Sequence, residues 1–233
     1  MARIDARLFV GPRGADLAAS TAYLALVHKM GFGDRLVGLK RYDFFHLVIE
    51  SEATAEKTIE ALTATLARQS TFYNRNKHMY SLECRWRGGE RVEGPTHQAM
   101  ASGFAKTMGI RANRQTGIDF DGKTESKVSI VNGSPAFLIE VFVQDDDRAG
   151  RDAIAAKLTR ELTASVGRGS VKVQAPSRAT VWWLAVRAQD EDAAMATARQ
   201  ITVTRRRDEG LLMNPNYQSA EFVSAGRVDT VRS

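Results

Sequence analysis

Residues 137–147 read Phe-Leu-Ile-Glu-Val-Phe-Val-Gln-Asp-Asp-Asp, and this stretch is the clearest guide to the fold. Its first seven residues are almost wholly apolar, as expected of a strand in the centre of a sheet. The carboxylates at 145–147 place negative charge where the dipole of a following helix favours it. We therefore expect a strand over Phe137–Val143 and a helix over Ala149–Val166, closed by Gly167-Arg168-Gly169.

The same order of elements occurs twice in the chain. After this helix we expect a strand over Val171–Val173, a turn at 175–177, a strand over Thr180–Arg187, a helix from Asp190 and a strand over Tyr217–Val223. The first part of the chain predicts a strand at 8–10, a helix capped by Asp16 and ending at Gly31, a strand at 35–40, a turn at 41–43, a strand at 44–50, a helix opened by Ser51 and a strand at 79–86. A repeated order of elements fixes the architecture before any single motif does.

The repeat predicts an α+β protein with two ferredoxin-like βαββαβ units that form a pseudo-dimer within one chain. We expect unit boundaries at 1–87 and 135–233, joined by a connector at 88–134. The connector is expected to hold a helix over Thr96–Met108 and a hairpin over 117–132 that turns at Asp121-Gly122. A second interpretation gives Met79–Ile110 its own strand and helix, which would shift these boundaries.

Composition excludes several classes of site. The chain has 233 residues, 43% of them hydrophobic, and a net charge of +6. It holds one cysteine, Cys84, so an internal disulfide and a multi-cysteine metal centre are excluded. No apolar run approaches the roughly 20 residues that span a bilayer, and the N-terminus lacks the apolar core of a signal peptide. We expect a cytoplasmic protein that contacts no membrane.

No set of residues predicts a catalytic centre, a cofactor or a metal. The four histidines show none of the spacings of a zinc site, and helix capping explains Asp145-Asp146-Asp147 better than a divalent ion does. Trp182-Trp183 lies within a strand, so one indole should face the helices and the other the opposite side of the sheet. Exposed basic residues are the candidates for partner binding: Arg13, Lys40, Arg41, Arg205, Arg206 and Arg207.

Short motifs in both halves resemble the small subunit of phosphoribosylformylglycinamidine synthase, the PurS family. The first half has His28-Lys29-Met30-Gly31-Phe32 and His46-Leu47-Val48-Ile49-Glu50, similar to that family's Met-Gly-Phe/Tyr and Leu-x-Ile-Glu elements. The second half has Leu211-Leu212-Met213-Asn214-Pro215, similar to its Leu-Leu-x-Asn-Pro. The family's Asp-Pro-x-Gly is absent, and the first half has Gln69-Ser70-Thr71-Phe72 in place of the Leu-Leu-x-Asn-Pro element.

The resemblance implies a support role. The family's subunit carries no catalytic residue, dimerises through its sheets and bridges an ATP-dependent synthetase to a glutaminase in purine synthesis. Two units in one chain would mimic that dimer covalently. On this basis we expect an assembly subunit whose partners are a synthetase, a glutaminase or both, with self-association left open.

Two other interpretations remain open at this stage. The net charge, the arginine clusters and Trp182-Trp183 also fit an RNA-binding or RNA-processing protein built from tandem ferredoxin-like units. A stand-alone enzyme with a site between the units ranks last, because no acid and base pair or activated nucleophile is visible.

Overall fold

The computed structural model describes residues 1–69, 72–74, 76–107, 110–111, 135–145, 147–167, 169–174, 176–206 and 210–230. The fold is α+β, as the repeat predicts. None of the helices within the described residues is long and apolar enough to cross a membrane.

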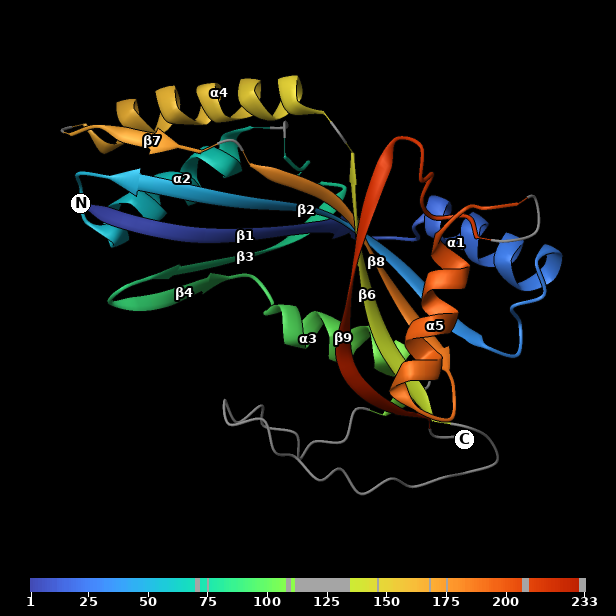
Figure 1. Cartoon of the computed structure of the whole chain (residues 1–233). Helices are drawn as coiled ribbons and strands as arrows, with labels where there is room; N and C mark the ends of the chain where they lie inside the picture. Colours follow the sequence, from blue (N-terminus) through green and yellow to red (C-terminus); the bar gives the residue numbers. More distant parts are fainter. Residues whose placement is uncertain are drawn as a thin grey trace. The chain divides into compact units, whose positions relative to one another are not determined.

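The elements follow one another along the chain as Figure 1 shows. In the first half they are β1 (Ala2–Pro12), α1 (Leu17–Leu24), the π-helical turn η1 (Ala25–Lys29), β2 (Leu36–Ser51), α2 (Ala55–Arg68), β3 (His78–Trp86), β4 (Gly89–Glu93) and α3 (His97–Thr107). After these come β5 (Ile110–Arg111), β6 (Ala136–Asp145), α4 (Arg148–Val166), β7 (Val171–Val173), β8 (Ser177–Arg187), α5 (Glu191–Thr202) and β9 (Gln218–Thr230).

The first compact unit, unit 1, comprises residues 1–15, 42–97 and 144–181. Its strands are hydrogen-bonded in the order β4-β3-β1-β2-β7, each pair antiparallel. Alternate residues of β1, among them Ile4 and Leu8, point into a core that α2 and α4 cover. Leu62 of α2 and Leu162 of α4 are fully buried in that core, so both helices lie on one face of the unit 1 strands.

The second compact unit, unit 2, comprises residues 16–41, 98–143 and 182–233. Its strand order is β2-β8-β6-β9-β5, with β2 contributing its first residues. Leu26 of η1 and Ile201 of α5 are fully buried beside Ile139 and Val141 of β6. The segment that holds α1 and η1 therefore covers the same face of the unit 2 strands as α5.

Each unit takes one helix and one strand segment from the other half of the chain. Unit 1 contains α4 and β7, which are encoded between β6 and β8, and β7 pairs with Ile49–Ser51 at the end of β2. Unit 2 contains α1, η1 and the start of β2, which are encoded after β1. These units therefore differ from the expected boundaries at 87 and 134, because β2, β6 and β8 each run from one unit into the other.

The local signals at helix ends are confirmed. Asp16 Oδ1 accepts the Ala19 amide at 3.1 Å, Asp147 Oδ1 accepts the Gly150 amide at 2.9 Å, and Asp190 Oδ1 accepts the Ala193 amide at 2.7 Å. Each carboxylate thereby satisfies an amide that the first helical turn leaves free. Gly31 and Gly167, which follow the helical segments, have φ angles of 73° and 79°, in the left-handed region that glycine tolerates.

The expected turn at Arg41-Tyr42-Asp43 is wrong, because β2 continues through it. Asp43 pairs with Val10, and Tyr42 is 1% exposed. The Tyr42 ring lies over Gly11, where an added Cβ would come within 2.6 Å of it. The Tyr42 ring therefore packs against β1 at a position where only glycine leaves room for it.

The predicted start of the second helix is wrong, the predicted connector helix is confirmed, and the predicted connector hairpin is not tested. Ser51 does not open the second helix; it ends β2, and Thr54 caps α2 instead. The connector helix is confirmed as α3, while the predicted hairpin at 117–132 lies outside the described residues. The strand β4, which pairs with β3 directly after Trp86, was not predicted from the sequence.

Candidate protein-interaction surface

Charged side chains cover one face of the unit 1 strands, opposite the helices. Because Ile4, Ala6 and Leu8 point into the core, the residues between them point the other way. The pairing of β1 with β2 and β3 brings similarly placed residues of those strands beside them. We call this set the open face, and its charged and histidine side chains are Arg3, Asp5, Arg7, His46, Glu50, Glu83, Arg85, Glu90 and Lys172.

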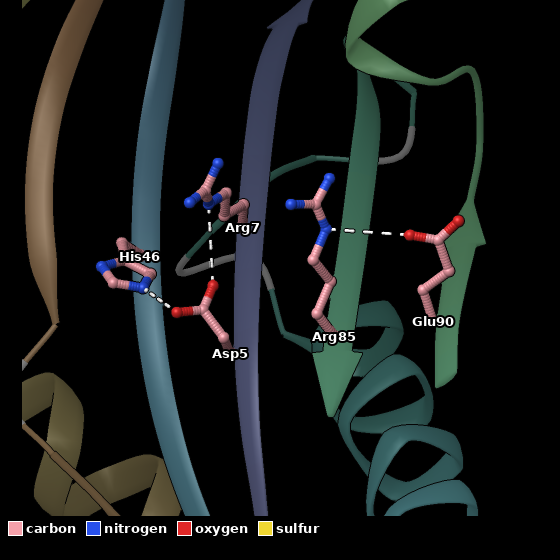
Figure 2. A network of polar contacts seen from close by, with 5 residues as sticks. All are labelled: Asp5, Arg7, His46, Arg85 and Glu90. Carbon is pink, nitrogen blue, oxygen red and sulfur yellow. Dashed lines mark hydrogen bonds and ion pairs between the residues drawn. The ribbon is translucent and has the colours of Figure 1, made fainter. Parts of the chain in front are cut away.

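Opposite charges alternate across the open face, as Figure 2 shows. Asp5 Oδ2 lies 2.9 Å from His46 Nε2, and Asp5 Oδ1 lies 3.6 Å from Arg7 Nε. On the next strands Arg85 Nε lies 3.7 Å from Glu90 Oε2. The five side chains are between 32% and 71% exposed, so each pair contributes no more than about 1 kcal/mol to stability.

Aromatic rings pack together at one end of the open face. The Phe9 ring lies 4.8 Å from that of Phe44 and 4.7 Å from the His97 imidazole, measured between centroids. The His97 amide donates to Glu83 Oε1 at 2.8 Å, which fixes the start of α3 against the strand β3. Phe9 is only 4% exposed, so its ring face is not available to stack on a ligand.

The charge balance of the open face indicates the kind of partner that it suits. The four cations Arg3, Arg7, Arg85 and Lys172 are matched in number by the four anions Asp5, Glu50, Glu83 and Glu90. A nucleic-acid backbone selects for positive charge, whereas alternating signs at fixed positions suit a protein surface with the complementary pattern. The open face therefore favours a protein partner.

The predicted partner-binding residues are divided between the two units. Arg13 is exposed, and its Nε donates to the His78 carbonyl at 2.9 Å in unit 1. Lys40 and Arg41 belong to unit 2, and as neighbours on β2 they point to opposite faces. Burial lowers the pKa of Lys40.

Arg41 already has structural contacts. Its Nε lies 3.3 Å from Asp16 Oδ2, and its guanidinium carbon lies 6.0 Å from the centre of the Trp182 ring. Arg205 and Arg206 are exposed after α5, while Arg207 lies outside the described residues. Of the six predicted residues, Arg13, Arg205 and Arg206 are thus exposed in the structure.

Both indoles of the tryptophan pair are buried. As expected, they point to opposite faces of β8: Trp182 joins the unit 2 core, and Trp183 lies 6.1 Å from the Phe104 ring of α3, between centroids. Trp182 is 8% exposed and Trp183 is 0% exposed. Neither indole can stack on a base as placed, which removes one of the observations behind the RNA-binding interpretation.

A small hollow in unit 1 and the buried Cys84 thiol also bear on possible chemistry. A hollow of about 90 Å³ lies between the start of α4 and β8, lined by Arg151, Arg178 and the cap residue Asp147 among others; small-molecule sites usually measure about 300–1,000 Å³. Within the described residues no three His, Cys, Asp or Glu side chains are grouped to hold a metal ion. Burial raises the pKa of Cys84 to about 12, so its thiol is protonated at neutral pH.

Matched turns before β3 and before β9 were missed in the sequence. Asn74 Oδ1 accepts the Asn76 amide at 2.9 Å, and Asn214 Oδ1 accepts the Asn216 amide at 3.0 Å. The Asn74 and Asn214 amides donate in turn to the side chain four residues later, at 3.1 and 2.9 Å. The Leu-Leu-x-Asn-Pro element therefore has a structural counterpart in the first half, and the repeated Asn-x-Asn was the available signal.

No known family model, curated protein or solved structure matches the chain.

Proposed function

We propose that this protein is a non-catalytic assembly subunit of a cytoplasmic amidotransferase complex similar to phosphoribosylformylglycinamidine synthase, in which it bridges a synthetase and a glutaminase. The proposal rests on the resemblance of the two halves to the PurS family, and on the two units and the open face of the structure.

The strand orders support two ferredoxin-like units. In a βαββαβ unit of this kind the strands lie in the order 4-1-3-2. Unit 1 has β3-β1-β2-β7, which fits if α4 and β7 supply the first helix and the second strand. Unit 2 has β9-β6-β8-β2, which fits if α1 with η1 and the start of β2 supply those two elements.

The exchange of these elements is the observation that carries the proposal. Two separate subunits that exchange a helix and a strand form a dimer in which neither is complete alone. Here each compact unit combines elements from both halves of one chain, and the matched Asn-x-Asn turns support the interpretation of the halves as structural repeats. A fused dimer of support subunits has this form.

Reconstitution tests the proposal. The chain is mixed with the synthetase and the glutaminase of the same organism, and complexes are measured by size-exclusion chromatography with light scattering. We expect a complex that contains this chain. Failure to bind either enzyme, with ATP and glutamine present, would overturn the proposal.

Charge reversal on the open face tests which surface is used. Arg85→Glu places a carboxylate beside Glu90 and should weaken the complex about tenfold or more. Lys57→Glu, on the exposed side of α2 in the same unit, is the matched control and should leave binding unchanged. If Arg85→Glu and Lys57→Glu weakened the complex equally, the loss of affinity would follow from the net charge of the chain and the open face would not be the binding surface.

RNA binding is the second candidate, and the net charge of +6 is the observation that favours it. A filter-binding titration of a single-stranded RNA distinguishes RNA binding from the assembly role. Salt is raised from about 50 to about 200 mM, a range over which binding through phosphate contacts weakens strongly. A steep fall in affinity with salt would support RNA binding, and no binding at the lower salt would exclude it.

A further inference from the structure

The exposed side of α1 in unit 2 carries no charge and presents two large apolar side chains. Leu17 is 78% exposed and Leu24, two turns further on, is 53% exposed. Thr21 lies between them on the same side of the helix and is also exposed. Between residues 17 and 27 the sequence contains no Asp, Glu, Lys or Arg.

The corresponding helix of the repeat provides the comparison. In unit 1 the place of α1 is taken by α4, whose exposed residues include Arg148, Asp152 and Arg160. A single exposed leucine has no special meaning, but an uncharged helical face with two of them is typical of a contact surface. The two repeats therefore differ in the outer face of the same helix.

Charge at the end of α1 distinguishes between occupants. His28 and Lys29 are exposed at the end of η1. Along the sequence the nearest acidic residues are Asp34 and Asp16, and Asp16 is paired with Arg41. A second copy of the chain would bring a second net charge of +6 to the contact. A different protein with carboxylates beside an apolar surface would be attracted by the positive charge of Lys29 and of the chain as a whole.

We infer that the outer face of α1 docks an apolar, acid-rimmed surface of a different protein, with Leu17 and Leu24 as the buried anchors and Lys29 at the acidic rim. The inference rests on the proposed function only for the identity of that protein. It adds a second contact surface to the open face, on the other unit, as a bridging subunit requires.

Site-specific photo-crosslinking tests the inference. The photoreactive residue p-benzoyl-phenylalanine replaces Leu24 in the full chain, which is expressed in its own organism, irradiated and analysed by mass spectrometry of crosslinked peptides. The same residue at Ala156, which is exposed on α4, is the matched control. We expect an adduct from position 24, absent from position 156, to an apolar peptide of another protein with nearby Asp or Glu.

Two further substitutions test the chemistry of the contact in the protein with the probe at 24. Leu17→Lys should reduce the adduct about tenfold or more, because a buried leucine contributes at least that factor to affinity. Lys29→Glu should reduce it as well, whereas Lys29→Arg should preserve it. Both side chains are exposed, and a thermal melt by circular dichroism confirms that the variants fold.

The identity of the crosslinked protein tests both the inference and the proposed function. An adduct to a synthetase or glutaminase supports the inference and the proposed function together. An adduct to a different protein of the stated chemistry supports the inference and counts against the proposed function. An adduct between two copies of this chain, an adduct unaffected by Lys29→Glu, or no adduct above the control would overturn the inference.

Discussion

Leu162 of α4 provides a direct test of the exchange between the two halves. Its side chain is fully buried in the unit 1 core, beside β1 and α2 of the first half. Leu162→Ala removes three buried carbon atoms and leaves a cavity. We expect this to lower the free energy of unfolding by about 3 kcal/mol. At 25 °C that cost corresponds to about a 150-fold change in the opening equilibrium of the elements that Leu162 stabilises.

Amide hydrogen exchange read by mass spectrometry measures where this cost falls. We expect the slowest amides of β1 and α2 to exchange roughly 100-fold faster in Leu162→Ala, with the smaller change in β6 and α5. The matched variant is Leu26→Ala in η1, equally buried in the unit 2 core. It should give the reverse result, with the larger change in β6 and α5.

The two variants together can refute the exchange. If Leu162→Ala accelerates β6 and α5 more than β1 and α2, then α4 stabilises its own half of the chain and the exchange is wrong. The same conclusion follows if Leu26→Ala accelerates β1 and α2 most.

Three smaller changes test local features. Gly11→Ala should cost about 1–3 kcal/mol in urea unfolding because its Cβ would meet the Tyr42 ring, whereas Gly14→Ala, with open space around it, should be neutral. Wild-type stability should fall relative to Cys84→Ala as pH rises from about 9 to 10, because the unfolded thiol loses its proton there and the buried thiol, with its pKa raised to about 12, does not; equal slopes in the two proteins would contradict this. Asn214→Ala should lower the melting temperature through the loss of about 1 kcal/mol, and Asn214→Asp, which keeps the accepting oxygen, should recover most of it.

Local features of the fold could be predicted from the sequence because they depend on neighbours in the chain. The apolar run at 137–143, the caps at Asp16 and Asp190 and the glycine at Gly31 each satisfy a local requirement of the backbone. The exchange of α1 and α4 could not be predicted, because periodicity shows which side of a helix is apolar and not which sheet that side meets. The turn expected at Tyr42 failed for a related reason, since its contact with Gly11 joins distant residues.

The candidate surface was predicted less well than the fold. Lys40 and Arg41 were both predicted to bind a partner, yet neighbours on a strand point to opposite faces. The alternation Arg3-Ile4-Asp5-Ala6-Arg7 was the available signal for the open face, because it places the charged residues on one side of β1. The strand β4 was missed because it is short, exposed and rich in charge.

The exchange of elements also determines when the chain can fold during synthesis. Leu26 has no core to enter until Val141 has been made, and at about 5–20 residues per second this takes roughly 6–25 s. For that time the nascent N-terminal half exposes apolar side chains and unpaired strand edges on the ribosome. The native contacts join residues far apart in sequence, so folding should be slow. A chaperone that shields the first half should therefore raise the yield of native protein, even though the chain, with its single cysteine, has no internal disulfide to form.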